Sequence, residues 1–408
     1  MLSIIYSCTP RIISNEEIFS KDNNPKSAPK KEKTSISKEQ SANNLIIQSN
    51  AIDNDILSEI EIILPINKNK SITENFINSL ELSLYKKNIN NLSFNINTYY
   101  EKKDLDEIVR KKIKPGKIFI GPLTSSDTLE MHKYCSEGVI FFSFASNREL
   151  ASDCIFLINF FPEDDLQALL NYFDSKTRLA LLYPENHYGN YISKIIDIYS
   201  VNSKAIIVNK VSYFEDMSNA RSAIKKLGKY DLRKQELERQ KKILKNKNDE
   251  ISIKALKKIE KFETIGDLDF THVIIADYNI RLLEIAPLLP FYDIDPNKIQ
   301  FVGTGVWDDE AFFYEPSLQN AIFPGVSVEK RDDFTKEYIS FYKAEPIRTF
   351  TIMHDLVGLL DYIIKKQSTT FSVFDLLNNK NLSFEGIDGK FSFEGNLIKR
   401  DLKILKIK

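Results

Sequence analysis

Short apolar segments alternate with helix-like segments over most of this 408-residue chain. Glu61–Ile66 is apolar along nearly its whole length, and the stretch after it places Phe76, Leu80 and Leu84 one helical turn apart. Strands that are apolar throughout and alternate with helices are typical of parallel sheets covered by helices on both faces. The pattern therefore predicts an α/β fold.

The alternation occurs in two series, and this length predicts two domains, so we expect two doubly wound lobes joined by a hinge. The first lobe is predicted to comprise 56–160 plus about 290–330. The second is predicted to comprise 161–289 plus about 331–408, with a long helical region at Arg331–Lys366 that Pro346 interrupts. The end of the chain, Gly386–Lys408, has the alternation of a β-hairpin. The other strands expected are Leu92–Tyr99, Lys117–Ile120, Val139–Phe144, Ile155–Phe160, Arg178–Tyr183, Ala205–Val211, Val273–Ala276 and Phe301–Gly303.

A charged insertion at 219–261 interrupts the second series. Its apolar positions are sparse, which predicts two amphipathic helices joined near Asn246–Asp249. Two interpretations remain open: the insertion contacts a partner protein, or it is a solvated decoration packed on its own lobe.

The first residues carry a possible membrane-targeting signal. Ile5, Tyr6, Ser7 and Cys8 resemble the lipobox of bacterial lipoproteins, which implies a truncated signal at 1–8 and a lipid on Cys8. The polar stretch 9–55 cannot bury enough apolar surface to fold, so we expect a disordered tether that spans about 40 Å. This predicts a periplasmic protein that a lipid anchors to a bacterial membrane, the outer membrane being favoured. The alternative is a cytosolic protein with an incidental early cysteine.

Composition and motifs exclude several functions. Lys plus Arg number 56 against 57 for Asp plus Glu, and this balance argues against a nucleic-acid partner. The four histidines have no metal-ligand spacing, and the chain lacks the motifs of common catalytic sites. Gly303-Thr-Gly-Val is too short to indicate a dinucleotide site. We therefore expect a binding protein without enzymatic activity, metal or cofactor.

Two further features leave alternatives. Cys135 and Cys154 form a disulfide or are separate buried thiols, and the second is favoured because one is expected in a helix and the other at a strand. Trp307 anchors the core or forms a ligand platform, and the core is favoured.

Ligands of doubly wound sheets bind beyond the carboxyl ends of the strands. In the first lobe, the candidate residues follow two strands with hydroxyl and amide groups that suit a carboxylate; they are Thr124, Ser125, Ser126, Ala145, Ser146 and Asn147. Their alternative role is to cap a helix and close a turn. In the second lobe, Tyr188 either closes over a ligand or is a surface tyrosine. Asp277 and Tyr278, just after the strand Val273–Ala276, are the other candidates of the second lobe.

Two segments resemble the first lobe of the type I periplasmic binding proteins, which include the leucine and branched-chain amino acid binding proteins. They are Ile120-Gly-Pro-Leu-Thr-Ser-Ser-Asp-Thr and Gly138-Val-Ile-Phe-Phe-Ser-Phe-Ala-Ser-Asn. Tyr183-Pro-Glu-Asn-His-Tyr-Gly is similar to a loop of the second lobe. The resemblance implies that the candidate residues hold the carboxylate and ammonium of an amino-acid-like ligand.

Within that superfamily, Tyr230-Asp-Leu-Arg-Lys-Gln-Glu-Leu-Glu and Ala286-Pro-Leu-Leu-Pro-Phe-Tyr-Asp-Ile-Asp-Pro resemble the penicillin-binding protein activators of alphaproteobacteria. That resemblance implies an envelope lipoprotein whose partner is a peptidoglycan synthase. The alternative is the solute-binding subunit of an ABC importer for amino acids.

Overall fold

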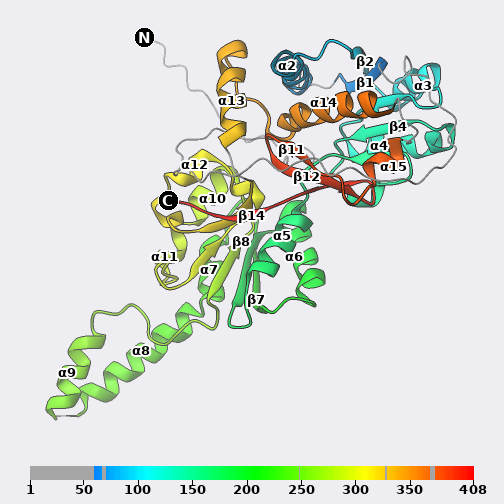
Figure 1. The fold of residues 1–408 in the computed structure, drawn as a ribbon. Coiled ribbons are helices and arrows are strands. Elements are labelled where there is room, and N and C mark those ends of the chain that lie inside the picture. The colour runs from blue at the N-terminus through cyan, green and yellow to red at the C-terminus, as the bar shows by residue number, and fades with distance from the viewer. Residues whose placement is uncertain (1–58, 67–69, 248, 327–328, 368–372) are drawn as a thin grey trace, which may run out of the picture. The chain divides into compact units, whose positions relative to one another are not determined.

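The structure is a computed structural model, and it describes residues 59–66, 70–247, 249–326, 329–367 and 373–408 (Figure 1). These residues form two compact units. Unit 1 contains the described residues of 59–160 and 329–400, and unit 2 contains those of 161–326 and 401–408. The predicted signal, tether and lipid-bearing Cys8 lie outside the described residues.

Unit 1 is built on an eight-stranded sheet with the order β11-β12-β13-β5-β4-β3-β1-β2. From β13 to β2 all neighbouring strands are parallel, whereas β11, β12 and β13 pair as antiparallel hairpins. The inner strands are buried, as expected for a sheet covered on both faces. The strands are β1 (Glu59–Pro65), β2 (Ser93–Tyr99), β3 (Ile118–Ile120), β4 (Ile140–Ser143), β5 (Ile155–Leu157), β11 (Phe384–Gly386), β12 (Gly389–Glu394) and β13 (Leu397–Arg400).

The helices of unit 1 come from both ends of the chain. Phe76 of α2 is fully buried, and its ring contacts Phe144 and Phe350 edge-on, with centroid distances of 5.6 and 5.3 Å. Phe350 belongs to α14, so this helix shares the core of the first strands. The break predicted at Pro346 is confirmed, because it lies between α13 and α14. The helices are α2 (Lys70–Lys87), α3 (Lys102–Lys112), α4 (Ser125–Met131), α13 (Glu329–Tyr342), α14 (Arg348–Gln367) and α15 (Val373–Leu377).

The predicted division of the C-terminal half was wrong. The segment at about 290–330 was assigned to the first lobe, but its described residues up to 326 lie in unit 2. The segment 331–408 was assigned to the second lobe, but its described residues up to 400 lie in unit 1. The physical reason is pairing across long sequence separations: β13 adds to β5 through Leu397 and Leu157, and α14 packs beside Phe76.

Unit 2 has a six-stranded sheet with the order β14-β10-β9-β8-β6-β7, in which only β14 is antiparallel to its neighbour. β14 (Lys403–Lys406) comes from the predicted terminal hairpin, so that hairpin is divided between the units. β10 (Ile322–Gly325) was not predicted. The other strands are β6 (Arg178–Pro184), β7 (Ile206–Tyr213), β8 (His272–Ile275) and β9 (Gln300–Val302). The helices are α5 (Pro162–Tyr172), α6 (His187–Ser200), α7 (Ala220–Leu227), α8 (Tyr230–Lys245), α9 (Glu250–Ile259), α10 (Asn279–Ile285), α11 (Leu288–Phe291) and α12 (Glu310–Phe313).

Trp307 is an anchor of the unit 2 core, as favoured from the sequence. Its side chain has no exposed surface and lies among the apolar side chains of the sheet and of α10 to α12. A Cβ atom added at Gly303 would lie 2.0 Å from the indole ring, so only glycine fits there. The Gly303-Thr-Gly-Val segment therefore serves packing around Trp307.

The two sheets share one strand order. It is β2-β1-β3-β4-β5 in unit 1 and β7-β6-β8-β9-β10 in unit 2. In each unit the order reverses between the first and third strands, β1 and β3 or β6 and β8. Such a reversal opens a crevice at the carboxyl ends of the strands, where doubly wound folds bind ligands.

The charged insertion contains the two predicted helices, α8 and α9, which are joined where α8 ends at Lys245 and α9 begins at Glu250. They extend away from the sheet of unit 2 as a helical hairpin (Figure 1). Within the described residues, no helix combines the length and the apolar character needed to cross a membrane.

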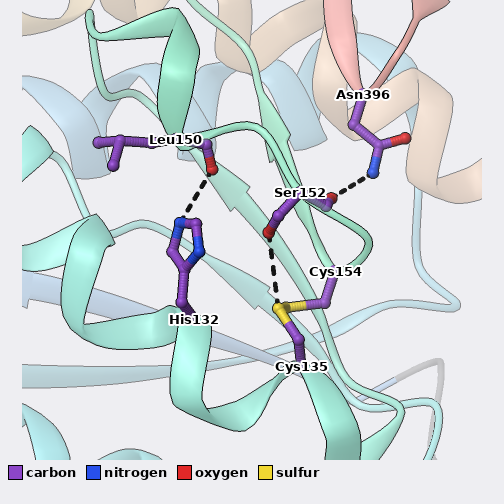
Figure 2. The surroundings of a disulfide bond; sticks show 6 residues. All are labelled: His132, Cys135, Leu150, Ser152, Cys154 and Asn396. Atoms are coloured by element: carbon purple, nitrogen blue, oxygen red, sulfur yellow. Dashed lines mark hydrogen bonds between the residues drawn. A yellow bond between two sulfur atoms is a disulfide. The ribbon is translucent and has the colours of Figure 1, made fainter.

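Cys135 and Cys154 form a disulfide, which corrects the favoured prediction of separate thiols. Figure 2 shows that the bond joins the short 3₁₀ helix at His132–Glu137 to the residue before β5. Ser152 Oγ lies 3.6 Å from Cys135 Sγ, and the Ser152 carbonyl accepts a hydrogen bond from Asn396. The disulfide therefore lies where three segments of unit 1 meet, a proximity that sequence spacing does not reveal.

Replacing both cysteines by serine is expected to lower the free energy of unfolding of unit 1 by about 3 kcal/mol, because the bond closes a loop with a sequence separation of 19 residues. Urea unfolding followed by far-UV circular dichroism measures this loss. Reductant should destabilise the wild type equally and leave the double variant unchanged. Equal unfolding midpoints for the oxidised and reduced wild type would contradict the prediction.

Candidate ligand-binding site

The candidate residues of unit 1 lie together at the carboxyl ends of two neighbouring parallel strands. Thr124, Ser125 and Ser126 follow β3, whereas Ala145, Ser146 and Asn147 follow β4. The Asn147 backbone N–H donates to Ser125 Oγ over 3.3 Å, so the two segments are in contact. Together they form a surface of hydroxyl and amide groups, which we call the serine edge.

Buried hydrogen bonds hold the serine edge in place. Ser143 Oγ donates to the carbonyl of Pro122 at 3.1 Å and lies 2.7 Å from Thr128 Oγ1. Gly121 has a φ of +102°, and a Cβ atom there would lie 2.4 Å from the Ile63 carbonyl oxygen. Gly121 is therefore required for the chain after β3 to pass this closely over β1.

The exposure of these side chains separates ligand candidates from supports. Ser126 and Asn147 are exposed, Ser125 and Ser146 are half-buried, and Ala145 is buried. The four serine and asparagine side chains are exposed at least in part and can reach a ligand. Ala145 is buried, and its backbone N–H donates to Ser143 Oγ.

Two residues of the serine edge also serve as helix caps. Thr124, and not Ser125 or Ser126, caps α4: its Oγ1 accepts the Asp127 backbone N–H at 3.1 Å. Asn147 caps the 3₁₀ helix at Arg148–Leu150 by accepting from the Glu149 N–H. Since α4 is only seven residues long, the side-chain hydroxyls, more than a helix dipole, provide the polarity here.

The candidates of unit 2 belong to one buried cluster at the carboxyl ends of β6, β7 and β8. Asp277 has no exposed surface, and Arg281 binds its carboxylate with Nε at 3.1 Å and Nη2 at 3.0 Å. Tyr213 donates its hydroxyl to the same carboxylate. Trp307 Nε1 donates to the Asp277 carbonyl oxygen at 3.0 Å. This carboxylate is therefore already neutralised within its own unit.

Burial is the largest influence on the pKa values of the cluster. Burial raises the pKa of Asp277, although Arg281 and Tyr213 act in the opposite direction. Burial also raises the pKa of Tyr213, and the adjacent Asp277 carboxylate raises it further. An ammonium group could reach Asp277 only by displacing Arg281, so the geometry does not favour the ligand role expected for this residue.

Tyr188 is only 2% exposed, so the alternative of a plain surface tyrosine is wrong. Its hydroxyl lies 2.6 Å from Thr304 Oγ1, and its ring packs edge-on against Tyr278, with 5.3 Å between centroids. Gly189 allows this position, because a Cβ atom there would lie 2.1 Å from the Pro184 carbonyl oxygen. Tyr188 and Tyr278 are thus buried against each other next to the carboxyl ends of β6 and β8.

Sequence reasoning missed three members of this cluster. Arg281 lies four residues after Asp277, a spacing that places an opposite charge one helical turn away and is visible in the sequence. Tyr213 and Thr304 carried no such signal, since each reaches the cluster from a different strand end.

Comparison with solved structures identifies the architecture. A putative branched-chain amino acid ABC transporter protein from Rhodospirillum rubrum matches with a TM-score of 0.62 and 15% identity, covering 86% of this chain and 97% of that chain. The chain has the type I periplasmic-binding-protein fold. A substrate-binding protein from Desulfitobacterium hafniense in complex with Leu matches with a TM-score of 0.54 and 14% identity, covering 86% of this chain and 97% of that chain. A solute binding protein from Rhodopseudomonas palustris in complex with 3,4-dihydroxy benzoic acid matches with a TM-score of 0.55 and 12% identity, covering 85% and 92%.

The type I fold confirms the predicted class of two doubly wound α/β lobes. The helical insertion predicted in the second lobe is formed by α8 and α9 of unit 2. At these identities the likeness shows the fold alone. No protein-family model and no curated protein sequence matches the chain. In the described part of the chain, no group of three or more His, Cys, Asp or Glu side chains is placed to hold a metal ion.

Proposed function

We propose that this chain is the solute-binding subunit of an ABC importer and binds a small carboxylate-bearing solute at the serine edge. The observation that carries the proposal is the contact between Ser125 and Asn147, which brings hydroxyl and amide groups from two strand ends onto one surface. Hydroxyl and backbone N–H groups are the donors that a carboxylate accepts from. The chain acts by binding, without catalysis and without a cofactor.

The solute class follows from the difference between the two units. The serine edge offers donors to an acid, whereas Asp277 is neutralised by Arg281 and offers little to an ammonium group. The required chemistry is thus a carboxylate, with or without an amino group. Proteins of the same fold include one crystallised with Leu and one with 3,4-dihydroxy benzoic acid, which has no amino group.

The compartment proposed is the periplasm, with a lipid on Cys8 as the membrane anchor. The Cys135–Cys154 disulfide supports an oxidising compartment, since such bonds are rare in reducing cytosol. Mass spectrometry of the membrane fraction tests the anchor: a diacylglyceryl thioether on Cys8 supports it, and an unmodified cysteine contradicts it.

Regulation of a peptidoglycan synthase is the second candidate. The pairing of Asp277 with Arg281 favours this second candidate. With its carboxylate bound to an arginine, Asp277 is poorly placed to bind the ammonium group of an amino acid. Resemblance of 230–238 and 286–296 to penicillin-binding protein activators supports the same candidate. The partner would then be the synthase, and the serine edge would have only a structural role.

Thermal unfolding with a panel of amino acids and aromatic or aliphatic acids separates the two candidates. A true ligand at a hundred times its Kd should stabilise the protein by about 2.7 kcal/mol. If no member of a broad panel shifts the transition and a peptidoglycan synthase co-purifies specifically, the importer proposal fails and the second candidate is supported.

Replacing Ser126 by glutamate is expected to weaken binding of an acid ligand at least about tenfold, because it places a like charge on the exposed part of the serine edge. Glutamate is well tolerated in the first turn of a helix, so folding should be unaffected. Isothermal titration measures the affinity. Ser136→Glu is the matched control: it is exposed near the far end of the following 3₁₀ helix and should leave the affinity unchanged. Equal affinities for both variants would place the ligand elsewhere.

A further inference from the structure

The helical hairpin of α8 and α9, which we call the arm, has little buried surface of its own. Tyr230 is buried at its base, and Leu237, Ser252 and Ile259 are buried along it. Nearly all other side chains of the two helices are exposed or half-buried, and the hairpin extends away from the unit 2 sheet (Figure 1). Most of the surface of the arm is therefore accessible to solvent or to a binding partner.

The end of the arm is strongly basic. Between 239 and 258 the chain has eight basic residues and two acidic ones, a net charge of +6. The whole chain has a net charge of −1, so the remainder carries −7. The charge is thus concentrated at one end of one structural element. The basic residues are Arg239, Lys241, Lys242, Lys245, Lys247, Lys254, Lys257 and Lys258.

Most of this positive charge is uncompensated. Arg239 pairs with Glu236 at 2.7 Å and Lys241 pairs with Glu238 at 3.2 Å. Asp249 is occupied as the N-cap of α9, where it accepts the Ser252 backbone N–H at 2.9 Å. The other six lysines of this end make no ion pair with any residue that the structure describes.

Aliphatic side chains are exposed among these lysines. The exposed fractions are 42% for Ile243, 81% for Ile251 and 46% for Ile253. Ile251 and Ile253 lie in the first turns of α9, beside the end of α8 that carries Ile243. Exposed isoleucines and lysines thus occur together at the end of the hairpin, although Ile251 and Ile253, two residues apart, lie on different sides of α9.

From this surface we infer that the end of the arm binds the surface of an anionic lipid bilayer. Lysines attract acidic headgroups, and Ile251, the most exposed of the isoleucines, enters the boundary between headgroups and acyl chains. A protein partner is disfavoured because lysine is depleted at protein interfaces, which are enriched in aromatic residues and arginine. The segment 239–258 has no aromatic residue, so it also lacks the stacking groups typical of single-stranded nucleic-acid sites.

Co-sedimentation with lipid vesicles tests the inference. The protein is the full chain with Cys8→Ser, so that no acyl chain can attach, and the probes are vesicles of pure phosphatidylcholine or with 30% phosphatidylglycerol. We expect binding to the anionic vesicles alone, and its loss between 50 and 500 mM salt as the charges are screened. The triple variant Lys254→Gln, Lys257→Gln, Lys258→Gln should bind at least about thirtyfold more weakly. Ile251→Ser with Ile253→Ser should weaken binding about tenfold.

The matched control removes three exposed lysines elsewhere, with Lys103→Gln, Lys176→Gln and Lys194→Gln, and should retain full binding. Glutamine is a good helix former, so circular dichroism should show the arm intact in the triple variant. Equal binding to neutral and anionic vesicles overturns the inference, as does anionic binding that the control reduces as much as the arm variant does. Specific capture of an acidic protein or a nucleic acid through the arm, without vesicle binding, also overturns it.

Discussion

Replacing Asp388 by alanine is expected to lower the free energy of unfolding of unit 1 by about 4 kcal/mol. Asp388 lies in the turn between β11 and β12 and has no exposed surface. Its carboxylate forms an ion pair with Arg348 and accepts hydrogen bonds from Thr351 Oγ1 at 2.7 Å and from Arg331 Nη1 at 3.4 Å. Removal of the carboxylate leaves two nearly buried guanidinium groups without this partner, and that desolvation cost is the source of the loss.

The ionisation of Asp388 agrees with its role. Burial alone would raise its pKa, but Arg348, Arg400 and Arg331 outweigh that effect and hold the pKa below its usual value. Asp388→Asn should therefore lose less stability than Asp388→Ala, because the amide oxygen still accepts hydrogen bonds but the ion pairs are gone.

Hydrogen exchange of α14 measures this loss, because that helix carries Arg348 and Thr351. Trp307 is the only tryptophan and lies in unit 2, so its fluorescence during urea unfolding should be little changed. Glu107→Ala on the surface of α3 is the control, since its ion pair with Lys111 is solvent-exposed. A loss below about 1 kcal/mol for Asp388→Ala would contradict the dependence of the arginines on this carboxylate.

Acid is expected to destabilise unit 1 through His354, by about 4 kcal/mol between pH 7 and pH 3. His354 is 8% exposed and packs edge-on against Phe334, with 5.4 Å between ring centroids. Burial, together with Lys87 and Lys86, lowers its pKa from 6.5 to about 3. Because the folded-state pKa is the lower one, protonation favours the unfolded chain, and stability falls as the pH drops from 6.5 towards 3.

Asp355, the next residue, opposes this effect. Burial raises its pKa to about 6. Because the folded-state pKa is the higher one, Asp355 contributes stability at low pH that is lost as the pH rises through 6. The effect of His354 is therefore measured as the difference between the wild type and His354→Gln.

Urea unfolding at a series of pH values, with hydrogen exchange of α14 as the readout, gives that difference. His354→Gln should gain on the wild type as the pH falls from 6.5. His187→Gln is the control, because His187 is exposed at the start of α6 in unit 2. Parallel pH profiles for the wild type and His354→Gln would refute the prediction.

The sequence by itself determined the fold class and most of the elements. Predominantly apolar strands such as β1 and β6 could be recognised because burial on both faces leaves few polar positions, Glu61 of β1 being a buried exception. Gly-Pro at 121–122 and the serines after it indicated the edge of the sheet, since strand ends are local features. The helices of the arm were also predicted, because their sparse apolar positions recur at a helical spacing.

Only the tertiary structure decided how distant segments combine. The assignment of 329–400 to unit 1, the Cys135–Cys154 bond and the pairing of Asp277 with Tyr213 all join residues that local patterns treat as independent. Periodicity reports which face of an element is buried, but not which other element buries it. Strand pairing and the neutralisation of a buried charge depend on which elements pack together, so they can be read only from the tertiary structure.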